Sequence, residues 1–204
     1  MQPFTCSMLC LLAIIIIFLS NNLTIIIATS RLPLQTNSDS NATNADFIKA
    51  SCQVTMYADL CFQTLSPYAA TIQINPMELA NAALSVSLKT AKSTSKIVRE
   101  LAKGRDLSMR DGQAVADCLE NMSDSVDEMK KSMVEMKDLD GPEFNEKMGN
   151  VKTWVSAALT DEDTCMDGFE DNVGKMKEII RGYIVNVAEL TSIALSLISN
   201  ISST

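Results

Sequence analysis

The residues best suited to do chemistry are acids that recur along one stretch of the chain. Glu120, Asp124 and Asp127 are four and then three residues apart, with Asp117 and Glu128 close by. This spacing places side chains along one side of an α-helix. It is typical of a solvated helix face or of an acidic docking surface that steers a partner. It does not indicate a carboxylate pair for hydrolysis, since nothing places two of these acids across a substrate cleft.

A second acidic group lies at residues 160–167, where the sequence TDEDTCMD surrounds one cysteine with four acids and two hydroxyls. Such residues either cap the first turn of a helix or form a polar loop that a disulfide ties to the acidic helix. Calcium is disfavoured because the glycine that an EF-hand loop requires is missing at that spacing. We expect no bound metal and no cofactor.

The chain has 204 residues, no histidine and a formal net charge of −8. The absence of histidine excludes Ser-His-Asp and Cys-His catalysis and histidine metal sites. The acidic balance, with a pI of about 4.6, argues against a nucleic-acid partner, because phosphates are bound by cationic groups. With 47% hydrophobic residues the chain can bury a core. The composition therefore favours a binding protein over an enzyme.

The N-terminus has the pattern of a secretory signal. An apolar run at Met8–Leu19 is followed by a second apolar patch that leads to the small residues Ala28 and Ser30. We predict a signal peptide at residues 1–30 and a disordered leader rich in Ser, Thr and Asn at residues 31–44. An uncleaved membrane anchor is the alternative, which two asparagines in the middle of the apolar stretch disfavour. After cleavage we expect no contact with a membrane.

Cysteine usage fits an exported chain. Two of the six cysteines lie in the predicted signal, which leaves Cys52, Cys61, Cys118 and Cys165. Four cysteines allow three pairings. The closeness of Cys52 and Cys61 favours a bridge within a hairpin, which leaves Cys118 to pair with Cys165. A zinc site is the alternative, but neither C-x-x-C spacing nor histidine supports it.

The spacing of apolar residues predicts a short helical hairpin at residues 45–67 and then four long helices. The first helix runs from Asn75-Pro76 to Lys103-Gly104, with proline at an early position and glycine at the end. The second has the clearest 4-3 repeat and ends at the LDGP sequence of residues 139–142. The third stops near Thr160-Asp161. The expected core positions are Leu79, Ala83, Val86, Ile97 and Leu101; Val115, Leu119, Met122, Val126, Met129, Met133 and Met136; Phe144, Met148, Val151, Val155 and Ala158; Phe169, Val173, Met176, Ile180, Tyr183, Val187, Thr191, Ala194 and Ile198.

Together these elements predict an all-α fold. It is an up-down-up-down four-helix bundle at residues 76–200, preceded by an N-terminal α-hairpin and held by two disulfides. In this topology Cys118 and Cys165 come close, because the second and third helices run in opposite directions. The methionines of the second helix offer an alternative, a metal or peptide groove. They fall on the predicted core stripe, so core packing is the favoured interpretation.

Three segments resemble those of a known protein family. They are DCLEN at residues 117–121, WVSAALT at residues 154–160 and DTCMDGF at residues 163–169. With the four cysteines, they are similar to the plant invertase/pectin methylesterase inhibitor family over residues 46 to about 199. The resemblance implies a secreted protein of the apoplast and cell wall, with an inhibitor domain at residues 45–200. It also implies one disulfide in the hairpin and one that joins the second and third helices.

Members of this family inhibit one of two cell-wall hydrolases. Invertase inhibitors typically present a Pro-Lys-Phe tripeptide, which this chain lacks, whereas its C-x-E-N-x-x-D-x-x-D pattern resembles inhibitors of pectin methylesterase. By this resemblance Glu120, Asp124 and Asp127 contact the enzyme, whose active site is itself acidic, and Thr164 and Asp167 form a second contact group. We therefore expect a 1:1 inhibitor of pectin methylesterase that limits pectin demethylesterification. Inhibition of acid invertase is the alternative.

Sequons for N-glycosylation lie outside the predicted signal at Asn41, Asn121 and Asn200. Asn121 is about 60° around the helix from Asp124. A glycan on Asn121 should obstruct the proposed acidic face. The site is therefore unmodified, or its glycan leans aside, or another surface makes the contact.

Overall fold

The computed structural model describes residues 37–103, 107–139, 141–170 and 175–201. By its contacts the chain divides into residues Met1–Ser40 and Asn41–Thr204, and the second unit holds the bundle. All regular secondary structure in the described ranges is helical. This confirms the predicted all-α class for that part of the chain. The predicted signal peptide and residues 31–36 of the predicted leader lie outside the described residues.

The hairpin consists of α2 (Asn37–Cys52) and α3 (Ala58–Leu65), followed by the short helices η1 (Ser66–Tyr68) and α4 (Ala69–Ile72). The predicted Cys52–Cys61 disulfide clamps α2 to α3. Helix α2 begins at Asn37, inside the segment predicted to be a disordered leader that ends at residue 44. The polar residues there are weak helix formers, but α2 is anchored at its other end by the disulfide and by the fully buried Ile48. A helix that is already nucleated can extend through such residues at little cost.

The bundle begins at α5 (Pro76–Lys103), as predicted. The side chain of Asn75 accepts a hydrogen bond of 2.9 Å from the backbone N–H of Met77, which caps the helix. Helix α6 (Met109–Glu135) starts in the same way, because the hydroxyl oxygen of Ser108 accepts the N–H of Asp111 at 3.1 Å. Gly141 turns the chain after α6 with a φ of 91°, a conformation that glycine adopts without strain.

The third bundle helix is longer than predicted, since α7 (Phe144–Asp167) continues through the segment expected to be a loop or a new cap. The hydroxyl of Thr160 donates to the carbonyl of Ser156 at 3.0 Å, and that of Thr164 donates to the carbonyl of Thr160 at 2.7 Å. Both hydroxyls therefore bond back along α7 instead of capping another helix. Cys165 lies within the last turns of α7, and not past its end.

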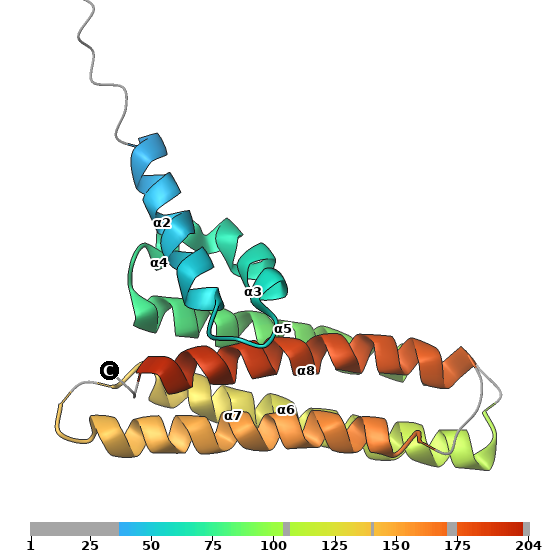
Figure 1. Cartoon of the computed structure of the whole chain (residues 1–204). Helices are drawn as coiled ribbons and strands as arrows, with labels where there is room; N and C mark the ends of the chain where they lie inside the picture. Colours follow the sequence, from blue (N-terminus) through green and yellow to red (C-terminus); the bar gives the residue numbers. More distant parts are fainter. Residues whose placement is uncertain (1–36, 104–106, 140, 171–174, 202–204) are drawn as a thin grey trace, which may run out of the picture. The chain divides into compact units, whose positions relative to one another are not determined.

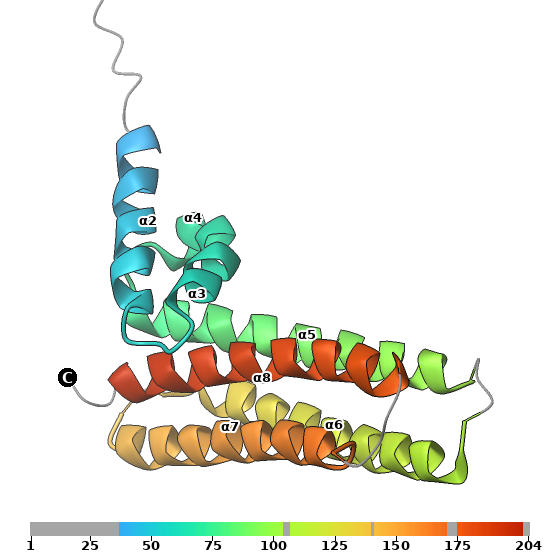
Figure 2. The ribbon, with the colours of Figure 1, turned by 45° about the vertical axis from the view of Figure 1, so that its right-hand side comes forward.

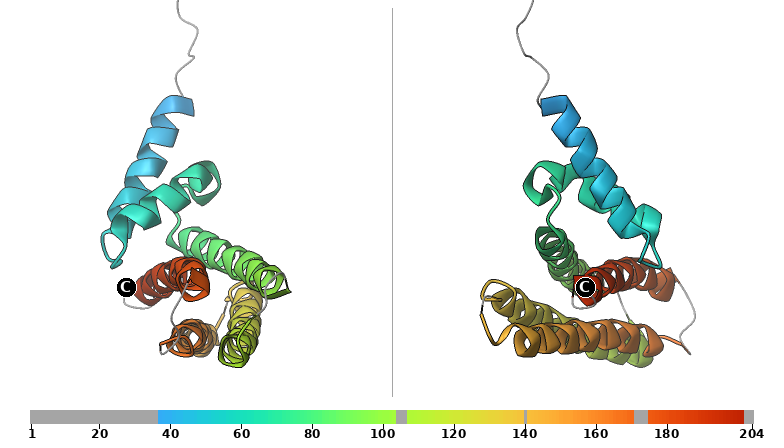
Figure 3. Two further views of the ribbon diagram at one scale, coloured as in Figure 1. Left: turned by 90° about the vertical axis from the view of Figure 1, so that its right-hand side faces the viewer. Right: turned by 60° about the vertical axis from the view of Figure 1, so that its left-hand side comes forward.

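The last helix, α8 (Lys175–Ile201), completes a ring in which α6 packs on α5 and α7, and α8 packs on α7 and α5. Consecutive helices run in opposite directions, so the predicted up-down-up-down topology is confirmed (Figures 1 and 2). Figure 3 shows the four helices obliquely from one end, with α8 between α5 and α7. The Cys118–Cys165 disulfide joins α6 to α7, as predicted.

The predicted core positions are mostly buried. Five of the seven stripe residues of α6 and its C-cap are buried, among them Met122 and Met129 with no exposed surface, while Leu119 and Met133 are half-buried. The methionine stripe therefore packs the core. On α5, Val86 and Leu101 are half-buried and pack against the core, and Ile97 is half-buried. The prediction was wrong for Tyr183, which is 40% exposed. The neighbouring Ile184 has no exposed surface. The predicted core residue Val173 and the side chain of Met176 lie outside the described part of the chain.

Helix α8 is long and apolar enough to cross a membrane by length and composition, over residues Lys177–Ile201. Its apolar residues lie on the side that faces the other helices, where Ile184, Val187, Ala194 and Ile198 are fully buried. A core helix of a bundle meets the same criteria as a membrane span. We therefore describe α8 as a core helix.

Candidate functional site

Helix α6 exposes the three acids singled out in the sequence. Glu120, Asp124 and Asp127 are all exposed, while Cys118, Met122, Ser125 and Met129 on the opposite side are buried. At about 100° per residue, Glu120 and Asp127 project in nearly the same direction and Asp124 is turned by about 40° to 60° from them. The acids therefore form one exposed face of α6, and the buried side of the helix packs against the rest of the bundle.

Asp127 is partly neutralised on this face. Its Oδ1 lies 2.7 Å from Nζ of Lys130, one turn further along α6. The hydrogen bond and charge of Lys130 lower the pKa of Asp127 below its ordinary value. Both side chains are more than half exposed, so water and salt screen the pair. Asp127 thus remains a carboxylate at mildly acidic pH.

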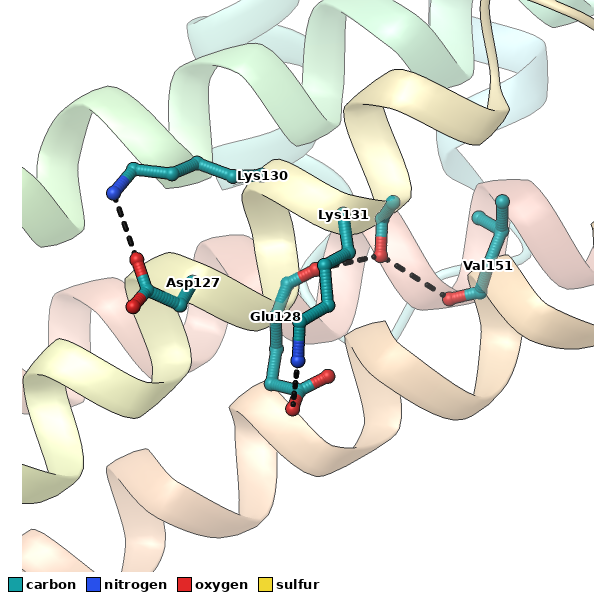
Figure 4. A network of polar contacts seen from close by, with 6 residues as sticks. Asp127, Glu128, Lys130, Lys131 and Val151 are labelled. Atoms are coloured by element: carbon teal, nitrogen blue, oxygen red, sulfur yellow. Dashed lines mark hydrogen bonds and ion pairs between the residues drawn. The ribbon is translucent and has the colours of Figure 1, made fainter.

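Glu128 points to a different side of the helix, toward α7, where it pairs with Lys131 at 3.2 Å (Figure 4). Its side chain is 22% exposed. In the described structure the second carboxylate oxygen, Oε2, is buried and has no hydrogen-bond partner. Close to this pair, the single hydroxyl proton of Ser132 is shared between the carbonyl oxygens of Glu128 at 3.0 Å and Val151 at 3.5 Å, and the second contact links α6 to α7. Glu128 therefore lies at the α6–α7 contact and is only partly paired.

A third carboxylate from α7 completes an acidic seam, defined here as Asp124, Glu128 and Asp161. Burial is the main cause that raises the pKa of Asp161, and the negative charges of Asp124 and Glu128 raise it further. Like charges from two helices therefore meet along this contact. We did not single out Asp161 and Glu128 as site residues from the sequence. The signal was present, since the Cys118–Cys165 pairing places residues shortly after Cys118 opposite residues shortly before Cys165.

The second predicted contact group, Thr164 and Asp167, lies in the last turns of α7 and is exposed. Since the Thr164 hydroxyl donates to the helix backbone, its oxygen is left to accept a hydrogen bond from a partner. Asp167 lines an open hollow of about 250 Å³ with Asp117 and Arg110 of α6. The structure therefore brings Asp167 together with Asp117, at the end of the bundle where α6 begins.

The sequon residues differ in exposure. Asn41 and Asn200 are exposed, whereas Asn121 is half-buried on α6, between Asp117 and Asp124 in the sequence. An attached glycan must leave the protein surface at its asparagine. Glycosylation at all three positions stays a prediction, and Asn121 is the one next to the acidic seam.

The arrangement suits binding better than catalysis. Glu120, Asp124, Asp127 and Asp167 are exposed, and the hollow beside Asp167 is open to solvent. Among the described residues no cluster of three or more acids, cysteines or histidines is arranged to hold a metal ion. What these two helices present is a rigid acidic surface, fixed by a disulfide that joins its two halves.

Comparison with known proteins gives one family. A sequence profile described as plant invertase/pectin methylesterase inhibitor matches residues 46–197. Pectinesterase inhibitor 9 of Arabidopsis thaliana is 42% identical over 191 residues, which are 89% of this chain and 94% of that protein. The 21 kDa protein of Daucus carota is 49% identical over 159 residues, 76% of this chain and 82% of that protein.

Two further comparisons concern the length of a relative and the fold of a solved structure. Pectinesterase inhibitor 10 of Arabidopsis thaliana is 46% identical over 168 residues, and the match spans 81% of this chain but 54% of that protein. The crystal structure of mutant form A of a pectin methylesterase inhibitor from Arabidopsis superposes with a TM-score of 0.61 at 18% identity. That superposition covers 74% of this chain and 95% of the other, and it shows a shared fold.

Proposed function

Because the chain belongs to the plant invertase/pectin methylesterase inhibitor family, we propose that it binds a pectin methylesterase and blocks that enzyme's cleft, with no chemistry of its own. The observation that carries the proposal is the similarity to Arabidopsis proteins named pectinesterase inhibitor, at 42% and 46% identity. The missing Pro-Lys-Phe tripeptide points the same way. Inhibition of acid invertase is the less supported alternative.

The proposed contact surface is the acidic face of α6 together with the end of α7. It comprises Glu120, Asp124, Asp127, Thr164 and Asp167, all of which are exposed. Both helices belong to the pair that the Cys118–Cys165 disulfide joins. A surface that is already rigid loses little conformational entropy when it binds. This supports a docking role for the pair, in a complex of one inhibitor with one enzyme molecule.

The proposed site of action is the plant cell wall. The predicted signal at residues 1–30 would direct the chain to the secretory route, where the two disulfides can form. In the wall the inhibitor would limit the demethylesterification of pectin by occupying the enzyme. A match between the chain's disulfides and an oxidising compartment supports this location.

The test is a titration of the disulfide-intact protein, without its signal, against a plant pectin methylesterase and against an acid invertase at several pH values. We expect complete loss of methylesterase activity near one equivalent and no effect on invertase. Inhibition of invertase alone would refute the proposal. Alanine substitution of Asp124 and Asp127, compared with the same change at Asp46 on α2 as a control, tests whether the α6 face makes the contact.

A further inference from the structure

One carboxyl group lies inside the bundle, at Glu162 of α7. Its side chain has no exposed surface, although it directly follows Asp161 of the acidic seam. The reason is the helix period, because Ala158 and Cys165 lie on the same side of α7 and are also buried. From the sequence we placed Glu162 in a polar segment, so its position in the core was not predicted. An acid in this position serves neither the proposed contact surface nor the outer solvation of the helix.

Glu162 is the centre of a hydrogen-bonded network that reaches all four bundle helices. Its Oε1 lies 2.8 Å from Oγ of Ser125 on α6 and 2.9 Å from Oγ1 of Thr191 on α8. Thr191 Oγ1 in turn lies 2.7 Å from Oγ of Ser87 on α5. None of these four side chains has exposed surface. A single acid on α7 is therefore linked through hydroxyls to the other three helices.

The hydroxyl groups have too few protons for the contacts that they make. Thr191 Oγ1 also lies 3.1 Å from the carbonyl of Val187, and Ser87 Oγ lies 3.4 Å from Sδ of Met129. Five contacts thus share three hydroxyl protons when the acid is ionised. If Glu162 Oε1 has a proton and donates it to Thr191, Thr191 can donate to Val187. The protonated acid therefore allows the hydrogen bond from Thr191 to Val187, which Thr191 cannot make while it donates to the ionised acid.

The surroundings also disfavour a charge on Glu162. Its Oε2 is buried and has no hydrogen-bond partner in the described structure, so an ionised group would leave a charged oxygen unpaired in the core. Burial raises the pKa of Glu162 to about 8, against the opposing hydrogen bonds from Ser125 and Thr191. The negative charges of Asp163 and Asp161 also contribute to this rise in pKa.

On the three other helices, most of the charged residues that are close in sequence to the network residues are acids. The cation Lys131 on α6 forms an ion pair of 3.2 Å with Glu128. The charged residues closest in sequence to Ser87, Ser125 and Thr191 are Lys89 on α5, Asp124 and Asp127 on α6, and Glu189 on α8.

We propose that Glu162 is a neutral carboxylic acid that links the four helices in acidic surroundings, and that its ionisation loosens the bundle as the pH rises. In the unfolded chain this group ionises near its ordinary pKa of 4.5, whereas in the folded protein it keeps its proton up to about pH 8. Between these values the unfolded state binds fewer protons than the folded state, so stability falls as the pH rises. The ratio of folded to unfolded protein then decreases by up to about tenfold per pH unit.

The first test compares urea unfolding of the native protein and of Glu162→Gln from pH 4 to pH 9. Glutamine keeps the shape of a neutral acid and also has one atom that accepts and one that donates hydrogen bonds, but it cannot ionise. We expect similar stability at pH 4 and a growing advantage of the variant up to about pH 8, where the difference levels off. The matched control is Glu146→Gln, at an exposed acid in the first turn of α7, which should leave the pH profile unchanged. Parallel profiles for the native protein and Glu162→Gln would overturn the proposal.

The second test uses the native chain and does not depend on whether a variant folds. In protein labelled with ¹³C at the glutamate side-chain carboxyl carbon, one resonance should keep the chemical shift of a protonated acid at pH 6. It should change only as the pH approaches about 8. If all glutamate resonances titrate near the ordinary pKa, Glu162 is ionised in the folded protein and the proposal is wrong. Neither test depends on the proposed inhibition of pectin methylesterase.

Discussion

The two helix pairs of the bundle differ in what holds them together and in what they expose. Helices α6 and α7 meet along like charges at Asp124, Glu128 and Asp161, and a disulfide joins them. Helices α5 and α8 contain no cysteine, and after Arg181 the only charged residue of α8 is Glu189. Buried apolar residues and the contact between the hydroxyls of Ser87 and Thr191 hold that second pair together. The crosslink therefore joins the two helices whose acids face each other, and it opposes the repulsion between those acids.

We expect the largest effect from removing each disulfide in turn, which tests whether α6 and α7 depend on their crosslink. Replacing Cys118 and Cys165 by alanine should cost about 4 kcal/mol of unfolding free energy, and replacing Cys52 and Cys61 about 2.7 kcal/mol. Cys118 and Cys165 are 47 residues apart in the sequence, whereas Cys52 and Cys61 are 9 residues apart. The first bridge therefore closes a longer loop and restricts the unfolded chain more. Urea and thermal unfolding of both double variants provide the comparison. A greater loss from the hairpin pair would show that the α6–α7 crosslink is not the dominant one.

The next largest effect concerns the packing of α8 against α5 and α7. Ile184→Ala should lose about 3 kcal/mol, because it removes a fully buried side chain and leaves a cavity. Tyr183→Ala is the matched control at the adjacent position, where the side chain is 40% exposed and the loss should be much smaller. Equal losses in thermal unfolding would mean that the apolar face of α8 is turned differently from its position here.

A third effect concerns the exposed acids of α6 and the proposed target. If they meet acidic groups of a methylesterase, their pKa values rise in the complex and the inhibitor binds more tightly at mildly acidic pH than at pH 7.5. The net charge of −8 acts in the same direction. Replacing Asp124 and Asp127 by asparagine should flatten this several-fold dependence, measured as the inhibition constant against pH. A slope that both substitutions leave unchanged would place the contact on another part of the bundle.

We expect the smallest effect from a substitution within the acidic seam, at Asp161. The raised pKa of Asp161 means that its ionised form is disfavoured in the folded protein, so its contribution to stability is lost as the pH rises. Asp161→Asn should therefore raise the thermal midpoint slightly at pH 7 and hardly at all at pH 4. Asp46→Asn, at an exposed acid within α2, should change neither value. A lower midpoint at pH 7 for Asp161→Asn would show that the seam attracts instead of repelling.

The parts of the fold that could be predicted from the sequence are those with a long, regular apolar period. The 4-3 repeat on α6 identified a helix whose buried side includes Met122 and Met129, and the two disulfide pairings followed from spacing and topology. The end of α7 was misjudged for a physical reason. Threonine and aspartate serve equally well as caps and as members of a helix whose hydroxyls bond back to the preceding turn.

The candidate site shows the same limit. Glu120, Asp124 and Asp127 lie on one exposed face because their relation depends only on the period of a single helix. The positions of Asp161 and Glu162 depend instead on how far α7 continues and how it is rotated against α6. One of these adjacent acids contributes to an acidic seam, and the other lies in the core. A difference of one residue in the helical register, which local composition does not encode, separates the two outcomes.

An even number of antiparallel helices brings the first and last residues of the bundle to the same end. Pro76 starts α5 and Ile201 ends α8, and these two helices pack against each other. Asp117 and Asp167 lie toward the opposite end, where α6 begins and α7 stops. A fluorescent reporter or an affinity tag fused after α8 would therefore lie at the end of the bundle away from those acids.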